Sequence, residues 1–305
     1  MLGVLEETKF LMKKYGITAN KSLGQNFLID DGIVEDTISS AHITKQDMVI
    51  EIGPGLGTLT SRLLEKAGKV IAIELDDRMI PILQERFSLY DNFILLHEDV
   101  LKVDLHGLIA ENIGDLENVK IVANLPYYIT TPIIMKLLED YLPVESITVM
   151  VQKEVADRIV AIPGEKNSGA ITYSVYYYAE PKDICFVPKE CFVPSPEVNS
   201  EIIQLKIRKK PVVNVKDEEL FFRVIKASFM QRRKTLLKGL LHGGIIQNKE
   251  EGKKIFEKMG LTENMRGENL TIEQFAKITE MLYSKEAFRD FSRKEFEHYD
   301  GSSKA

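Results

Sequence analysis

The sequence predicts an α/β protein whose main domain holds a seven-stranded, mostly parallel, doubly wound sheet, followed by a small all-helical domain. Two observations lead to this fold class. Short apolar runs alternate with helix-like segments over about the first 205 residues, which is typical of parallel sheets whose strands are connected by helices. Beyond the stretch Arg208-Lys209-Lys210-Pro211, apolar residues recur at helical spacing up to about Lys285.

The expected elements define three segments of the chain. Residues 1–210 form the sheet domain with an N-terminal extension, residues 211–285 form the helical domain, and residues 286–305 form a polar tail that we expect to be disordered. The expected strands cover residues 48–52, 70–74, 93–97, 121–123, 146–152, 170–178 and 201–207. The expected helices between them cover residues 59–66, 79–87 and 131–139.

The composition excludes several classes of protein. The 305 residues are 44% hydrophobic and 28% charged, which is ordinary for a globular chain. No apolar run approaches the roughly 20 residues that span a bilayer, and the N-terminus lacks a signal-peptide pattern. Only two cysteines occur, without zinc-site spacing. We therefore expect a cytoplasmic protein with no membrane segment, no disulfide framework and no metal site.

Positive charge is concentrated in two stretches, although the whole chain carries a net charge of −6. Residues 206–238 hold 11 Lys and Arg against three acids, and residues 9–21 hold four lysines and no acid. The candidate contacts to RNA phosphates are Arg232, Arg233, Lys234 and Lys21, because ionic contacts are local under physiological screening. Solvated helix faces have similar charge patterns, so both interpretations stay open.

A glycine-rich stretch, Gly53-Pro54-Gly55-Leu56-Gly57, follows the first expected strand. Gly53 and Gly55 are candidate cofactor contacts, because glycine at a strand-to-helix turn lets a ligand approach the backbone closely. The dinucleotide fingerprint G-x-G-x-x-G requires its third glycine where this chain has Thr58. A pyrophosphate site is therefore disfavoured, which leaves another cofactor or a tight turn without a ligand.

Acidic residues follow the next two expected strands. Glu74 ends the second strand, 21 residues after Gly53, where a carboxylate accepts the hydroxyls of a ribose. Asp99 and Val100 lie just beyond the third strand; Asp99 would accept from the amino group of an adenine, and Leu75 would pack on the ring. These residues predict a nucleoside cofactor without a pyrophosphate.

The residues Asn124-Leu125-Pro126-Tyr127 follow the fourth expected strand, at the sheet edge where α/β proteins bind ligands. The Asn124 side-chain oxygen, the Leu125 carbonyl before Pro126 and the Tyr127 ring suit the exocyclic amine of a flat base. Two hydrogen bonds to that amine would make its nitrogen more tetrahedral and aim its lone pair. S-adenosylmethionine fits as the partner of such an amine and NAD does not, so the pattern predicts methyl transfer.

Five motifs are spread over nearly the whole chain: LGQNFL at 23–28, GPGLG at 53–57, NLPY at 124–127, FVPSP at 192–196 and QRRK at 231–234. Together they resemble the KsgA (RsmA) family of small-subunit rRNA adenine dimethyltransferases. The resemblance implies a Rossmann-like, S-adenosylmethionine-dependent methyltransferase domain with a helical C-terminal domain. By position, the implied cofactor contacts are Asn26, Leu28, Gly53, Glu74, Asp99 and Asn124.

The resemblance also implies a substrate. Tyr127 and Phe192 would hold the target adenine, although a core tyrosine and a loop-anchoring phenylalanine are the alternatives. The implied reaction dimethylates the N6 amines of two adjacent adenines in the loop of the 3′-terminal hairpin of 16S rRNA. The partner would be the immature 30S subunit, and the enzyme is expected to be a monomer without an obligate protein partner.

Other functions stay open at this level. An Erm-type methyltransferase performs the same chemistry on large-subunit rRNA, and a DNA adenine methyltransferase is disfavoured because no target-recognition segment is evident. A ribosome-assembly checkpoint factor, for which binding matters more than catalysis, would share the same motifs. A nicotinamide dehydrogenase is disfavoured by the glycine spacing. The tyrosine-rich run 173–178 is expected to be a packed strand and not a platform for a base.

Overall fold

The chain divides into two compact units. The computed structural model describes residues 3–20, 23–231 and 234–284. Unit 1 comprises Met1–Val160 and Tyr178–Lys209, and unit 2 comprises Ala161–Tyr177 and Lys210–Ala305. The division at Lys209 lies next to the expected domain boundary, whereas the segment 161–177, expected in the first domain, groups with the second. None of the described helices is both long enough and apolar enough to span a membrane.

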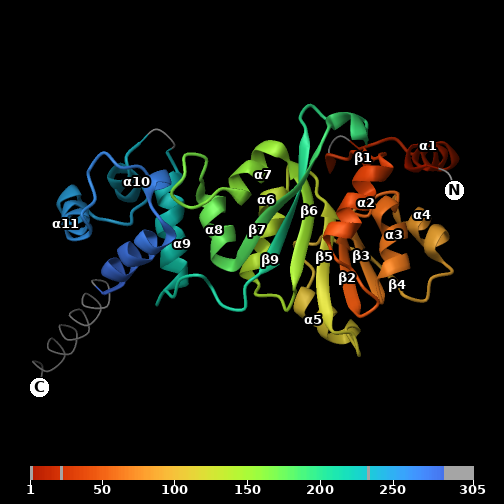
Figure 1. Cartoon of the computed structure of the whole chain (residues 1–305), viewed down its shortest axis with the longest axis horizontal. Helices are drawn as coiled ribbons and strands as arrows, with labels where there is room; N and C mark the ends of the chain where they lie inside the picture. Colours follow the sequence, from red (N-terminus) through yellow and green to blue (C-terminus); the bar gives the residue numbers. More distant parts are fainter. Residues whose placement is uncertain (1–2, 21–22, 232–233, 285–305) are drawn as a thin grey trace, which may run out of the picture. The chain divides into compact units, whose positions relative to one another are not determined.

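A seven-stranded sheet forms the centre of unit 1 (Figure 1). Its strands are β2 Asp47–Ile52, β3 Lys69–Glu74, β4 Phe93–His97, β5 Asn118–Asn124, β6 Ser146–Gln152, β7 Ala179–Val187 and β9 Ser200–Ile207. Their spatial order is β4-β3-β2-β5-β6-β9-β7; the first five are parallel, and β9 and β7 are antiparallel to their neighbours. Strands β3 and β4 are added on one side of β2, and β5 and β6 on the other, so the switch point of the sheet lies between β2 and β5. In open α/β sheets, ligands bind at the carboxyl ends of the strands beside such a point.

Four helices connect the parallel strands: α3 Thr58–Lys66, α4 Ile80–Phe87, α5 Leu105–Asn112 and α6 Thr130–Glu139. The helices α1 Val4–Tyr15 and α2 Asp31–Ser40 precede β2, and α7 Lys153–Val160 follows β6. Apolar residues of α1 to α4 share one buried core with Val49, Val70 and Val122 of the sheet. The strands β2, β5 and β6 are buried along almost their whole length, as expected for parallel strands covered on both faces.

Two short strands outside the main sheet bring distant motifs together. Strand β1, Phe27–Leu28, pairs antiparallel with strand β8, Phe192–Val193, and places Leu28 opposite Phe192. The Ile29 N–H also donates to the Cys191 oxygen at 2.8 Å. The N-terminal motif at 23–28 is therefore fastened to the FVPSP segment and not only to its own neighbours.

Most of the expected elements are confirmed. The expected strands 93–97 and 146–152 coincide with β4 and β6, and four further expected strands lie within β2, β3, β5 and β9. The expected helices match α3, α4 and α6 to within one residue. The mostly parallel, seven-stranded architecture is therefore as expected, although its seventh strand is a different segment.

The expected strand at 170–178 is wrong, because these residues form helix α8, Ala170–Tyr178. The missing seventh strand is the next segment, β7, which pairs with β9. Aromatic and β-branched residues such as Tyr173 and Val175 favour strands on a propensity scale. Both are fully buried here, and a short apolar run without periodicity does not distinguish a buried helix from a buried strand.

Unit 2 is helical. Besides α8 it contains α9 Glu218–Phe229, α10 Leu236–His242, α11 Lys249–Met259 and a helical segment at 272–284. The Tyr173 ring packs against Phe229 and Phe275, with centroids 5.4 and 4.9 Å away, and its hydroxyl donates to the Leu270 oxygen at 2.6 Å. These contacts explain why the segment 161–177 belongs to this unit. The polar tail at 286–305 lies outside the described residues.

Candidate active site

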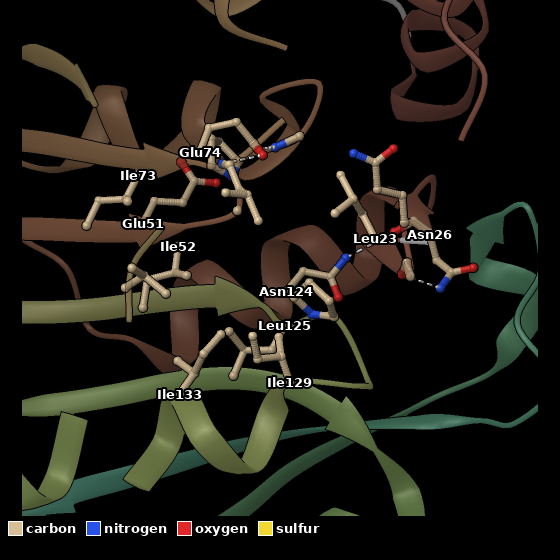
Figure 2. A pocket seen from close by; sticks show the side chains of 18 of the residues that line it. Leu23, Asn26, Glu51, Ile52, Ile73, Glu74, Asn124, Leu125, Ile129 and Ile133 are labelled. Atoms are coloured by element: carbon tan, nitrogen blue, oxygen red, sulfur yellow. Dashed lines mark hydrogen bonds between the residues drawn. The ribbon is translucent and has the colours of Figure 1, made fainter. Parts of the chain in front are cut away.

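A pocket opens at the carboxyl ends of β2, β3 and β5, at the switch point of the sheet (Figure 2). Its empty space, which includes the open mouth, is about 1090 Å³. The lining residues come from the N-terminal motif, the glycine loop, the turns after three parallel strands and the start of α6: they are residues 23–28, 51–56, 58–59, 73–75, 98–100, 124–129 and 133. The structure thus gathers three of the five sequence motifs, together with the acidic residues after β3 and β4, in one pocket of unit 1.

The glycine loop forms one wall of the pocket. Gly55 has a φ of +57°, and its N–H donates to the Glu74 carboxylate at 3.0 Å. Gly57, with a φ of +84°, is the N-cap of α3, and a Cβ atom there would lie 2.6 Å from the Phe87 ring. Glycine is therefore required at Gly57 both by backbone conformation and by packing.

Glu74 presents an oriented carboxylate to the pocket. One carboxylate oxygen accepts from the N–H groups of Leu75 and Asp76, both at 2.8 Å, and the other accepts from Gly55. Burial raises the pKa of this carboxyl, while the three main-chain donors oppose the rise. The donors hold the side chain in place and leave acceptor capacity for a hydroxyl group.

Glu51, which no sequence pattern singled out, is a second buried acid in the pocket lining. It accepts from the Thr60 hydroxyl at 2.6 Å. Burial, reinforced by repulsion from Glu74, raises its pKa to about 8. The sequence signal that could have identified Glu51 is an acidic residue within an apolar strand; the structure shows this strand buried along its whole length.

The mouth of the pocket has both an apolar and an acidic side. Leu75 is 48% exposed and offers an apolar surface, and Val100 is buried beneath the mouth. One oxygen of Asp99 accepts from the Leu101 N–H at 3.0 Å, and the other lies 3.7 Å from the Lys102 ammonium. All three sequence-predicted residues therefore line the pocket.

Asn124 ends β5 and points toward the N-terminal motif (Figure 2). Its side-chain N–H donates to the Asn26 main-chain oxygen at 3.2 Å. The Asn124 Oδ1 is the only acceptor of that amide, and the tether to Asn26 leaves it available to a ligand. The Asn26 side chain itself donates to the Gly24 oxygen at 3.0 Å, so Asn26 orients Asn124 through its backbone.

The residues after Asn124 turn the chain into α6. The Leu125 N–H donates to the Met150 oxygen at 3.2 Å, and the Pro126 oxygen accepts from Ile129 at 3.2 Å. Tyr127 is half-buried, and its hydroxyl lies 2.6 Å from that of Ser200. Burial raises the pKa of the Tyr127 phenol, which stays protonated and holds the ring against β9.

Tyr128 is a pocket residue that the sequence reasoning missed. Its side chain is 56% exposed and lines the mouth, and a Cβ atom on Gly24 would lie only 3.2 Å from its ring. The sequence shows two adjacent tyrosines, Tyr127 and Tyr128, but does not show which of the two rings is exposed. Tyr128 offers the aromatic surface that was expected of Phe192.

Phe192 does not join the pocket. Its side chain is 2% exposed and packs in the core of unit 1, on a strand paired with β1. In this conformation no face of the ring is accessible to a base, because an apolar ring between two paired strands is most stable in the core. The stacking role therefore stays a prediction that requires β8 to move, and loop anchoring is the role that the contacts support.

The predicted RNA contacts are only partly described. Lys21, Arg232 and Arg233 lie outside the described residues. Lys234 is exposed in unit 2, just before α10, and its N–H donates to the Gln231 oxygen at 2.9 Å. In the part of the chain that the structure describes, no three His, Cys, Asp or Glu side chains cluster closely enough to hold a metal ion.

Comparison with known proteins places this site in a family. The family model described as ribosomal RNA adenine dimethylase matches residues 16–284. The chain is 48% identical over 279 residues to ribosomal RNA small subunit methyltransferase A of Bacillus pumilus, covering 90% of this chain and 95% of that protein. It is 49% identical to the protein of the same name from Clostridium acetobutylicum, covering 90% and 98% of the two chains.

Two solved structures have a similar fold. A dimethyladenosine transferase from Plasmodium falciparum is 26% identical, with a TM-score of 0.68 over 83% of this chain and 95% of that one. The 23S rRNA methyltransferase ErmE is 23% identical, with a TM-score of 0.63 over 84% of this chain and 99% of that one. At that identity the second likeness concerns the fold alone.

Proposed function

The chain belongs to the ribosomal RNA adenine dimethylase family, and on that premise we propose that it dimethylates two adjacent adenines in 16S rRNA. The methyl groups come from S-adenosylmethionine, and the acceptors are the N6 amines in the loop of the 3′-terminal hairpin. The observation that carries the proposal is the Asn124 amide, tethered to Asn26 at the edge of a pocket lined by strand-end carboxylates.

The pocket fits a nucleoside cofactor. The Glu74 carboxylate is buried, oriented by three N–H groups and able to accept from a ribose hydroxyl. Leu75 would cover one face of an adenine, and Asp99 would accept from its amino group. Gly53 and Gly55 have positive φ angles, which favour glycine, and because they lack side chains they leave the loop open where the methionine part would pass. Asn26 and Leu28 would close the pocket from the N-terminal side.

Asn124 and Leu125 would prepare the acceptor for methyl transfer. When bound, S-adenosylmethionine supplies a methyl group that its sulfonium already activates. The Asn124 Oδ1 and the Leu125 main-chain oxygen would accept hydrogen bonds from the adenine N6, which turns the nitrogen lone pair toward that methyl. Asn124 and Leu125 would hold N6 where it can take up the methyl group that the cofactor would supply, and N6 would give up one proton to water. Positioning of this kind is worth about 7–11 kcal/mol in well-oriented systems.

The target base must leave its stack to enter the pocket. Unstacking costs a few kcal/mol and is least costly in a loop, while stacking on an aromatic ring returns roughly 1–3 kcal/mol per base. Tyr127 provides a ring at the inner end and Tyr128 an exposed ring at the mouth. These two residues would therefore offset much of the cost of extruding the adenine.

The RNA partner follows from the same premise. We assign recognition of the immature 30S subunit to the basic residues of the helical region, including Arg232, Arg233 and Lys234, with Lys21 as a further phosphate contact. The proposed enzyme acts in the cytoplasm as a monomer. The proposed catalytic domain is residues 1–210, apart from the segment 161–177 that groups with unit 2, and the proposed RNA-binding domain is residues 211–285.

The direct test is a methylation assay on separated ribosomal subunits. Small and large subunits from cells that lack this protein would be incubated with the purified chain and methyl-labelled S-adenosylmethionine. We expect label in the small subunit alone, and mass spectrometry of its rRNA should find N6,N6-dimethyladenosine at two adjacent positions near the 3′ end. Label in the large subunit alone would contradict the proposal and indicate an Erm-type enzyme.

A further inference from the structure

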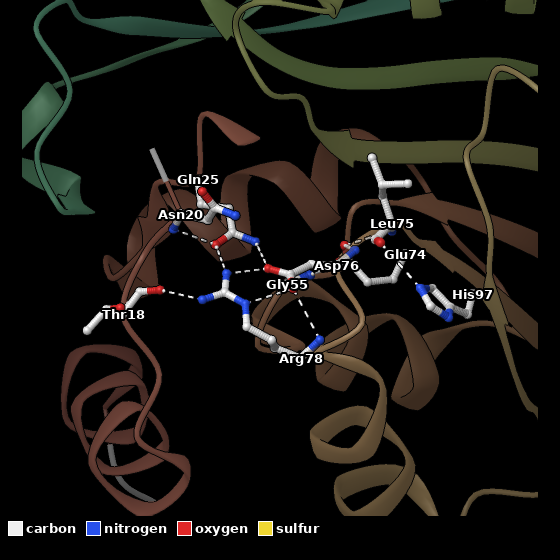
Figure 3. Close-up of polar contacts among 9 residues, drawn as sticks. All are labelled: Thr18, Asn20, Gln25, Gly55, Glu74, Leu75, Asp76, Arg78 and His97. Atoms are coloured by element: carbon white, nitrogen blue, oxygen red, sulfur yellow. Dashed lines mark hydrogen bonds and ion pairs between the residues drawn. The ribbon is translucent and has the colours of Figure 1, made fainter. Parts of the chain in front are cut away.

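A buried aspartate lies just outside the pocket, two residues after Glu74. Asp76 is 4% exposed and is not among the pocket-lining residues. Its two oxygens accept from the Arg78 guanidinium at 2.9 and 2.5 Å, and one of them accepts from the Gln25 side-chain amide at 2.6 Å (Figure 3). Both neighbours lower the pKa of Asp76, so this carboxyl is ionised at neutral pH.

The Arg78 guanidinium also contacts the N-terminal segment directly. It donates to the Thr18 main-chain oxygen at 3.2 Å and to the Gln25 side-chain oxygen at 3.3 Å. The same Gln25 oxygen accepts from the Asn20 N–H at 2.9 Å. Thr18, Asn20 and Gln25 thus converge on one ion pair at the end of β3 (Figure 3).

This cluster connects the two ends of the proposed cofactor site. On one side, the Asp76 N–H donates to Glu74, the proposed ribose acceptor. On the other side, Gln25 is followed directly by Asn26, whose main-chain oxygen holds the Asn124 amide. Hydrogen bonds therefore connect Glu74 to Asp76 and Asp76 to Gln25, and the peptide bond from Gln25 to Asn26 continues the path to Asn124.

We propose that Arg78 is a positioning residue that fastens the N-terminal segment over the cofactor pocket through Asp76 and Gln25. The inference rests on the proposed function, because it concerns binding of S-adenosylmethionine. Arg78, 37% exposed on its side chain, is the counter-charge of the 3% exposed Asp76, and its removal should lower stability as well as affinity, because it leaves a buried carboxylate without a counter-charge. Its role lies in ordering one wall of the site before the cofactor arrives, which lowers the entropic cost of binding.

The test is a double-mutant cycle in cofactor affinity. The variants are Arg78→Ala, Gln25→Ala and the two combined, each titrated with S-adenosylmethionine by calorimetry. Each single change should weaken binding about tenfold, a typical effect for one charge-assisted contact. The double variant should also bind S-adenosylmethionine about tenfold more weakly than the wild type, and not a hundredfold, because both residues act through one cluster. Arg78→Lys should not restore binding, because an ammonium cannot reproduce the two parallel donors to Asp76.

Two readouts separate positioning from general damage. The KM for S-adenosylmethionine should rise about tenfold while kcat at saturating cofactor changes less than about threefold, the pattern of a lost binding contribution. The control is Arg62→Ala on α3, whose arginine is 28% exposed and pairs with Glu65. It should leave affinity, KM and Tm unchanged.

A cofactor-free measurement distinguishes failure of this inference from failure of the proposed function. Amide hydrogen exchange of the peptide covering residues 17–27 should be faster in Arg78→Ala than in the wild type, and unchanged in Arg62→Ala. Equal exchange in all three proteins would overturn the inference, as would single changes whose effects on affinity simply multiply. A wild-type chain that binds no S-adenosylmethionine, yet shows the exchange difference, would overturn the proposed cofactor and leave the fastening role of Arg78 standing.

Discussion

The side-chain amide of Asn124 is tethered to the main-chain oxygen of Asn26, 98 positions earlier in the chain, at 3.2 Å. This bond joins the end of a central strand to the N-terminal motif and determines which end of the amide faces the pocket. Because the N–H end is occupied by Asn26, the acceptor oxygen is presented to the ligand. Such an acceptor receives a hydrogen bond from an N–H or O–H group, and an amine is one such donor.

Asn124→Ala should remove the acceptor without removing the pocket. We expect methyl transfer to small subunits to fall by about 10²–10³-fold, the cost typical of losing one preorganised polar contact to the reacting group. Affinity for S-adenosylmethionine, measured by calorimetry, should change less than about threefold, since most of the lining is untouched. The matched control is Asn118→Ala at the opposite end of the same strand, where the amide donates to Asp47. Equal activity of the two variants would contradict this role of Asn124.

Tyr128→Ala should weaken the use of RNA but not of cofactor. Loss of a stacking ring costs roughly 1–3 kcal/mol, so kcat/KM for the subunit substrate should fall about 5–150-fold. Tyr128→Phe keeps the ring and should retain nearly full activity. The measurement is initial rate against subunit concentration at saturating S-adenosylmethionine. If the Phe variant is as impaired as the Ala variant, the hydroxyl and not the ring face is what matters.

Glu51→Gln should flatten the dependence of stability on pH. The folded-state pKa of Glu51, about 8, lies above its unfolded value, so the folded state binds the extra proton between about pH 4.5 and 8. This contribution is fully present below about pH 4.5 and is lost as pH rises through 8, up to roughly 5 kcal/mol in total. Urea unfolding at pH 5, 6.5 and 8 checks this. Parallel losses in wild type and variant would show that Glu51 does not titrate as expected.

Replacing Arg232, Arg233 and Lys234 together with Ala should lower the salt dependence of RNA binding. Each phosphate contact contributes about −0.7 to −0.9 to the slope of log K against log salt, so the slope should become less negative by about 2–3. Filter binding to the 3′-terminal hairpin at several salt concentrations measures it. A control with Lys249, Lys253 and Lys254 replaced, all on or beside α11, removes the same charge elsewhere in unit 2. Identical slopes for the first variant and the wild type would assign the basic stretch to a solvated surface.

Phe192→Ala should act on stability. Removing a buried aromatic ring typically costs about 3–5 kcal/mol, so the midpoint of urea unfolding should fall clearly. Phe192→Leu keeps most of the apolar volume and should retain the activity of the folded protein. A Leu variant that is stable but has lost affinity for RNA would instead support the stacking role.

Sequence reasoning succeeded where local pattern and chemistry coincide. Strands such as β4 and β6 were bounded correctly because each is a short apolar run between polar turns. The residues Gly53, Glu74, Asp99 and Asn124 could be placed in one site because the carboxyl ends of parallel strands meet at one edge. The family was also evident from five motifs that keep their spacing.

Sequence reasoning failed where the environment of a side chain decides. The run 170–178 is a helix whose Tyr173 is buried against Phe229 and Phe275 of unit 2, which lie far away in the chain. Phe192 is buried on β8, which pairs with β1, whereas the Tyr128 ring is exposed. Neither outcome follows from local periodicity.

The order of motifs along the chain was enough to predict the fold class, which the structure confirms, and to propose the cofactor edge of the sheet and the chemistry. Tertiary structure alone decided which groups share hydrogen bonds: Asn26 with Asn124, and Gln25 with Asp76 and Arg78. The physical reason is range. Strand and turn preferences act over a few neighbouring residues, whereas a hydrogen bond forms only when two groups come within about 3 Å. For residues 98 positions apart, only the packed fold brings them that close.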